Sequence, residues 1–113
     1  MQENPFAKEL NKWNLLDSIS ASGGGGTSNT KTVTFPTFYN ELLVTVESGG
    51  TVYASSVCTS GHSGVMAIYT GIDSAGNHTF SISAELSSTT LRVAHTYNRY
   101  GSSISVDAKV YYR

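Results

Sequence analysis

Apolar and polar residues alternate along most of this chain, in short runs that end at glycine, serine or asparagine. The clearest run is 78–86, whose apolar side chains all fall on one face of a strand: Phe80, Ile82, Ala84 and Leu86. Hydroxyl and acidic side chains fill the other face. Successive side chains of a β-strand point to opposite sides, so a period of two indicates a half-buried strand. The chain is therefore expected to be all-β.

The alternating pattern recurs about eight times. We expect strands at 13–20, 30–35, 41–47, 51–58, 65–70, 78–86, 89–97 and 104–112. Turn signals separate these segments at spacings near ten residues, which is typical of an antiparallel sandwich or barrel and not of a parallel α/β sheet. The pattern predicts a jelly-roll-like β-sandwich of about eight strands, although periodicity leaves the strand order open.

Glycine marks the expected turns. Gly49 and Gly50 follow one strand directly, and adjacent glycines permit the positive φ angles of a tight hairpin. The run 22–29 holds four consecutive glycines, and we expect a surface loop there because such a run is too flexible for a strand interior. With 113 residues the chain has room for one domain, which we place at 13–113.

The segment 1–12 follows a different period. Phe6, Leu10 and Trp13 fall at i, i+4 and i+7, and Asn4 and Pro5 suit the cap and first turn of a helix. A short amphipathic helix at about 5–12 is the prediction. Two helical turns are marginal in water, so this helix needs a partner, either the domain or other copies of the chain. Its three apolar side chains are the candidate oligomer contacts.

Charge and cysteine content exclude several classes of protein. Charged residues make up 13% of the chain and the formal net charge is -1, so there is no electrostatic footprint for nucleic acid or an anionic membrane. Cys58 is the single cysteine, which excludes an intrachain disulfide and a multi-thiolate zinc site. No apolar run approaches 18 residues, and residues 1–10 do not resemble a signal peptide.

No arrangement of residues points to catalysis. His62, His78 and His95 are far apart, so a converging zinc site is not expected. The chain lacks a G-x-S-x-G nucleophile elbow, its acidic residues are scattered, and the glycine run at 23–26 lacks the remaining P-loop residues. We expect no catalytic residue, no cofactor and no metal.

Tyrosine is the most informative residue type, because seven tyrosines stand against four phenylalanines and one tryptophan. A tyrosine offers a rigid apolar face and one hydroxyl, and with serine, glycine and asparagine it is typical of binding loops. We take as candidate ligand-binding residues those of the loop 97–102 and one turn histidine: Tyr97, Asn98, Arg99, Tyr100 and His62. These groups suit a sugar ring or a protein surface. The alternative is that tyrosines pack at sheet edges with their hydroxyls in water.

Two stretches carry a resemblance to a known family. Residues 13–16 read WNLL, residues 33–44 read VTFPTFYNELLV, and the chain ends in AKVYYR. These resemble C-terminal domains of phage and prophage tail proteins from Gram-positive gut bacteria, over roughly 13–47 and 104–113. The resemblance implies a trimeric β-sandwich at the tip of a tail fibre or baseplate, located in the virion, that contacts a host-surface glycan or protein. It implies no catalytic residue.

Two alternatives stay open beside this reading. The first is a structural particle protein, such as a head decoration or a shaft segment, whose sheet faces neighbouring subunits. The second is a carbohydrate-binding module of a secreted protein.

Overall fold

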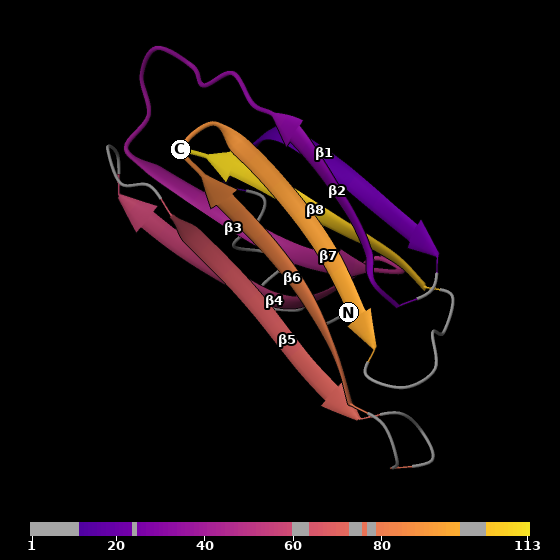
Figure 1. Ribbon diagram of the computed structural model, residues 1–113. Coiled ribbons are helices and arrows are strands. Elements are labelled where there is room, and N and C mark those ends of the chain that lie inside the picture. The colour runs from indigo at the N-terminus through magenta and orange to yellow at the C-terminus, as the bar shows by residue number, and fades with distance from the viewer. Residues whose placement is uncertain (1–11, 24, 60–63, 73–75, 77–78, 98–103) are drawn as a thin grey trace.

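The chain folds into two packed β-sheets in a computed structural model that describes residues 12–23, 25–59, 64–72, 76, 79–97 and 104–113 (Figure 1). Within these residues there are eight strands: β1 (Asn14–Gly23), β2 (Thr27–Thr32), β3 (Glu41–Ser48), β4 (Thr51–Thr59), β5 (Val65–Ile72), β6 (Thr79–Ser87), β7 (Thr90–Tyr97) and β8 (Ile104–Tyr112). The antiparallel β-sandwich of about eight strands is confirmed. The expected helix at 5–12, with Phe6 and Leu10, lies outside the described residues.

Each sheet has four strands, and every pairing is antiparallel. The first sheet has the order β1-β8-β3-β4 and the second has the order β2-β7-β6-β5. The strands near the two ends of the chain pair with each other, β1 with β8 and β2 with β7. A jelly roll would also pair β3 with β6 and β4 with β5, and these pairs are not formed among the described strands. The middle of the chain pairs locally, as the β3–β4 hairpin and the β5–β6–β7 meander. As a result β1 and β2 form one long side of the sandwich, and β4 and β5 form the other (Figure 1).

The core lies between the sheets and is built from the expected faces. The alternating residues of β6, β7 and β8 all face it and are almost fully buried: Ile82, Ala84, Leu86, Leu91, Val93, Val106, Ala108 and Val110. His95 also lies on the inner face of β7 and is 2% exposed. Burial of these side chains is the main favourable contribution to folding, because apolar surface leaves water.

A row of rings runs from the exposed Tyr53 on β4 to the buried His95 on β7. The ring centroids of Tyr53 and Tyr69 are 4.9 Å apart, those of Tyr69 and Phe80 are 6.0 Å apart, and those of Phe80 and His95 are 6.4 Å apart. Gly71 faces Phe80 across the β5–β6 pair, and a Cβ atom there would come within 2.6 Å of the Phe80 ring. Glycine therefore makes room for the ring on this strand.

The glycine-rich loop is shorter than expected. Residues 22–29 were expected to form one surface loop, but β1 continues to Gly23 and β2 begins at Thr27, which leaves a connection of three residues. The flanking residues pair with neighbouring strands, Ser22 with Ser105 and Asn29 with Val93. Backbone pairing in an existing sheet outweighs the weak strand propensity of serine and glycine here. The expected strand at 30–35 is thus displaced towards the N-terminus.

Strand β3 is buried on both faces. Leu42, Val44 and Val46 face the core, but Leu43 and Thr45 on the outer face are also buried, with 3% and 0% of their surface exposed. β3 lies between β8 and β4, and on β8 the long side chains of Tyr111 and Lys109 lie opposite Leu43 and Thr45. This produces a second small apolar cluster outside the sandwich core, made of Trp13, Leu43 and Tyr111.

Candidate functional site

Of the five candidate binding residues identified from the sequence, Tyr97 is the one that lies within the described residues. His62 belongs to the connection between β4 and β5, and Asn98 to Tyr100 belong to the connection between β7 and β8; all four lie outside the described residues. Tyr97 ends β7 and pairs with Phe80 through its backbone. Thr59, the last residue of β4, pairs with Glu41 at one end of the first sheet, and β8 begins with Ile104 at the other end of that sheet.

A hollow of about 370 Å³ lies at the end of the sandwich where β1 begins and β8 ends. Three aromatic side chains and two amides line it: Phe38, Tyr39, Tyr112, Asn14 and Asn40. Thr37 and Arg113 complete the lining. The volume is within the usual range of small-ligand sites, and rings beside a few polar groups are the usual composition of such sites.

Backbone hydrogen bonds hold the segment 37–40 against the end of the chain. The amides of Asn40 and Glu41 donate to the carbonyl oxygen of Arg113 at 2.7 and 2.9 Å, and the Arg113 amide donates to the Glu41 carbonyl at 3.1 Å. Tyr39 is fixed from behind by Phe35, with ring centroids 5.9 Å apart. Backbone hydrogen bonds therefore hold the lining residues in place where β3 begins and β8 ends.

Phe38 has the largest exposure of any large apolar side chain described, at 88%. A phenylalanine on a well-anchored segment contributes no core energy when its ring is in water. Phe38 lines the hollow and presents a flat apolar surface to solvent there.

The charge in the hollow is neutralised within the chain. Arg113 Nε lies 2.8 Å from Glu41 Oε1, and its guanidinium stacks over the Trp13 ring at 4.1 Å from the ring centroid. An arginine with a carboxylate and an aromatic face as partners is held in one orientation. Because this charge is already paired, the lining favours a neutral ligand over an anionic one. Trp13 itself is 8% exposed and packs within the chain.

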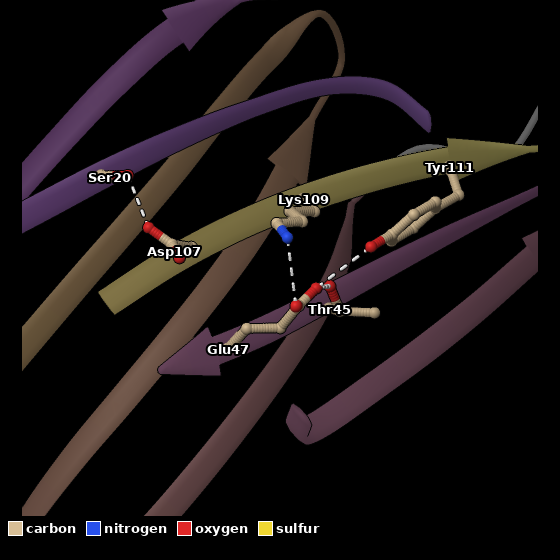
Figure 2. A network of polar contacts seen from close by, with 6 residues as sticks. All are labelled: Ser20, Thr45, Glu47, Asp107, Lys109 and Tyr111. Atoms are coloured by element: carbon tan, nitrogen blue, oxygen red, sulfur yellow. Dashed lines mark hydrogen bonds and ion pairs between the residues drawn. The ribbon is translucent and has the colours of Figure 1, made fainter. Parts of the chain in front are cut away.

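A polar network covers the outer face of the first sheet (Figure 2). Glu47 is 6% exposed, and its carboxylate accepts hydrogen bonds from the hydroxyls of Thr45 at 2.6 Å and Tyr111 at 3.2 Å. Lys109 Nζ lies 3.2 Å from the other carboxylate oxygen. Each oxygen of this buried carboxylate has a partner, so the network joins β3 to β8 as a structural clamp.

The Tyr111 hydroxyl is the group in this network whose titration we expect to be visible. Burial raises the pKa of Tyr111 to about 12, and the neighbouring negative charge of Glu47 adds to the rise. In the unfolded chain a tyrosine loses its proton near pH 10. Stability that is complete below pH 10 is therefore lost as the pH rises to about 12, because only the unfolded state ionises over this interval.

We expect the wild type to lose on the order of 2 kcal/mol more stability between pH 10 and 12 than Tyr111→Phe, which has no hydroxyl to titrate. Urea unfolding followed by circular dichroism at each pH measures the difference. An equal loss of stability between pH 10 and 12 in the wild type and in Tyr111→Phe would contradict the assignment of this loss to the Tyr111 hydroxyl. Tyr112→Phe, one residue further along β8, is the matched control.

Comparison with known proteins found no matching family model, no curated relative and no similar solved structure. In the part of the chain that the structure describes, no group of three or more His, Cys, Asp or Glu side chains is placed to hold a metal ion. The same residues contain no helix with the length and apolarity needed to cross a membrane.

The sequence does not predict this hollow, although four of its seven lining residues lie in one short segment. The segment VTFPTFYNELLV places Phe38, Tyr39 and Asn40 directly after Pro36, between two strands. Two aromatic residues and an amide in a short proline-containing connection are a signal for a binding surface. The remaining lining residues come from the two ends of the chain, and nothing local in the sequence connects them to this segment.

Proposed function

We propose that this chain is a non-enzymatic recognition domain that binds a neutral glycan on a cell surface, as expected of the tip of a phage or prophage tail protein. The hollow at the β1 and β8 end carries the proposal, because it combines an exposed ring with amide groups and a neutralised arginine. The partial resemblance to phage tail domains supplies the biological setting, in which the domain belongs to a virion and contacts the host.

The chemistry of a sugar fits each part of the lining. The apolar face of a pyranose ring stacks on an aromatic side chain, and Phe38 offers such a face to solvent. The amides of Asn14 and Asn40 both donate and accept hydrogen bonds, as neighbouring sugar hydroxyls require. Asn14 Nδ2 lies 3.4 Å from the carbonyl oxygen of Tyr112, a long contact that a ligand hydroxyl can replace.

Replacing Phe38 by alanine is expected to weaken glycan binding about tenfold, since a stacked ring contributes up to about 1.5 kcal/mol. The probe is an array of neutral and acidic surface polysaccharides from Gram-positive bacteria, followed by calorimetric titration of the polysaccharides that bind. The control is Thr30→Ala, which removes an exposed side chain from β2, a strand that contributes no residue to the lining. We expect this control to bind like the wild type.

Two outcomes would contradict this site. One is binding restricted to acidic glycans, and the other is unchanged affinity in Phe38→Ala. Arg99→Ala and Tyr100→Ala test the loop 97–102 in the same assay. A loss in these two variants, with Phe38→Ala unaffected, would move the site to the loop 97–102.

A structural particle protein is the second candidate, and one observation favours it. The side of the sandwich formed by β4 and β5 is free of charged residues and carries exposed apolar side chains, as a surface for neighbouring subunits does. A carbohydrate-binding module of a secreted protein shares the glycan chemistry of the leading proposal. Trimer formation through the segment of Phe6, Leu10 and Trp13 remains a prediction, with Trp13 already packed inside its own chain.

A further inference from the structure

The two long sides of the sandwich differ in charge. Residues 48–72, which span β4, β5 and their connection, contain no aspartate, glutamate, lysine or arginine. Each of these strands is the last in its sheet, and each pairs with one neighbour in the described part of the chain. Their outward N–H and C=O groups are therefore available for pairing with another strand.

The opposite side, formed by β1 and β2, carries features that keep natural edge strands from pairing with another chain. Lys31 of β2 forms an ion pair with Asp17 of β1 at 2.7 Å, which joins the two sheets and places charges on both edges. The side chain of Asn29 donates to the carbonyl oxygen of Ser20 at 3.0 Å, so a β1 backbone group is occupied. β1 also has a bulge between Leu15 and Asp17. Charges and bulges prevent edge-to-edge association.

Exposed apolar side chains follow the uncharged side. Met66, Ile68 and Ile72 on β5 are 45, 54 and 63% exposed, and Val57 on β4 is 52% exposed. Their inward neighbours on β5, Val65 and Ala67, are buried in the core, so the outward row is regular. An uncharged edge of this length with an apolar row beside it is an aggregation risk if it stays in water.

The area of this side is close to what specific association requires. A strand of eight or nine residues spans about 30 Å. The molecule is 18 Å thick. The side therefore presents on the order of 500 Å² per copy, and two copies reach the threshold of about 1,000 Å² for a specific interface.

We propose that the β4–β5 side binds a second copy of this chain, with β5 pairing antiparallel to β5 of the partner across a two-fold axis. The surface is self-complementary because it carries no charged residue. Two copies can therefore face each other without repulsion between like charges and without a need for opposite charges. With Tyr69 at the axis, Met66 lies opposite the partner's Ile72 and Ile68 lies opposite the partner's Thr70. The outward rows of the two strands then lie side by side, and each cross-strand pair adds stability.

This pairing is independent of the proposed glycan site. The hollow is lined by residues of β1, β8, the segment 37–40 and the last residue of the chain, and none of its lining comes from β4 or β5. Both hollows of the pair therefore stay open, and two linked sites bind a repetitive surface more tightly than one.

Light scattering coupled to size-exclusion chromatography of the full chain at about 100 µM tests the pairing. The wild type is expected at twice the 12.0 kDa mass of the chain, in place of the trimer predicted from the N-terminal segment, and Ile68→Lys is expected at the mass of one chain. Thr30→Lys places the same charge on the exposed face of β2 and should leave the double mass unchanged. Thermal unfolding by circular dichroism confirms that both variants are folded.

Met66→Glu provides a second test on the same strand, with a charge of the opposite sign. If the two β5 variants both dissociate the pair, the effect belongs to the surface and not to one substitution. A monomeric wild type, an assembly whose mass Ile68→Lys leaves unchanged, or a mass of three chains would each overturn the two-fold β5 pairing.

Discussion

Replacing Trp13 by alanine is expected to lower the free energy of unfolding by about 3 kcal/mol. Trp13 is 8% exposed, packs with Leu43 and Tyr111, and carries the guanidinium of Arg113 over its ring at 4.1 Å. Alanine leaves a cavity beside β3 and removes the cation–π contact. Trp13 is the single tryptophan, so urea unfolding has to be followed by circular dichroism and not by fluorescence.

Trp13→Phe is the matched control for this substitution. Phenylalanine keeps an apolar ring and removes the indole N–H, which is buried without a hydrogen-bond partner among the described residues. We expect a loss of about 1 kcal/mol, because part of the packing is kept and an unpaired polar group is removed. If the loss in Trp13→Ala instead depends on protein concentration, Trp13 acts between copies, as the helical spacing with Phe6 and Leu10 predicts.

The strands that the sequence predicts best are those whose inner faces carry apolar side chains at every second position. The inner faces of β6, β7 and β8 are regular, and Ile82, Leu91 and Val106 all lie in the core as their period requires. Ala94 and Tyr111 on the outer faces are also buried, which the period does not predict. The side of the sandwich at β1 and β2 was placed less well. There serine, threonine and glycine form strands because β8 and β7 offer backbone partners, and a partner distant in sequence leaves no local signal.

The outer face of β3 shows a second limit of periodicity. The alternation separates Leu42, Val44 and Val46 from Leu43, Thr45 and Glu47, but it does not show that both sets are buried. That outcome depends on β3 being an inner strand, with Tyr111 beside it from 64 residues further along the chain. The strand order decides whether the outer face of β3 is buried, and the strand order is a property of the whole fold.

The sequence does not predict the hollow, again because the strand order brings its lining residues together. Asn14, Phe38 and Tyr112 are brought together because the first and last strands pair with each other and the last strand pairs with β3. Loop composition predicts a binding site at 97–102, because tyrosine, asparagine and arginine are adjacent in sequence there. Local composition identifies residue types suited to binding, whereas the meeting of distant segments has to be seen in the structure.

Glu47→Ala is expected to cost about 3 kcal/mol of stability, because removing one member of a buried ionic network leaves the others without partners. Thr45 is fully buried and loses its acceptor at 2.6 Å, and Lys109 loses its counter-ion at 3.2 Å (Figure 2). Urea unfolding at neutral pH measures the loss. Glu85→Ala, which removes a half-buried carboxylate from β6 on the other sheet, should cost about 1 kcal/mol or less.

Glu47→Gln separates the charge of this side chain from its hydrogen bonds. Glutamine keeps an acceptor for the Thr45 and Tyr111 hydroxyls but forms no ion pair with Lys109, so we expect about half the loss of Glu47→Ala. It also removes the negative charge that helps to raise the pKa of Tyr111. The loss of stability above pH 10 should then shrink without disappearing, because burial is the larger cause of the rise. Equal losses in Glu47→Gln and Glu85→Ala would contradict a clamp between β3 and β8.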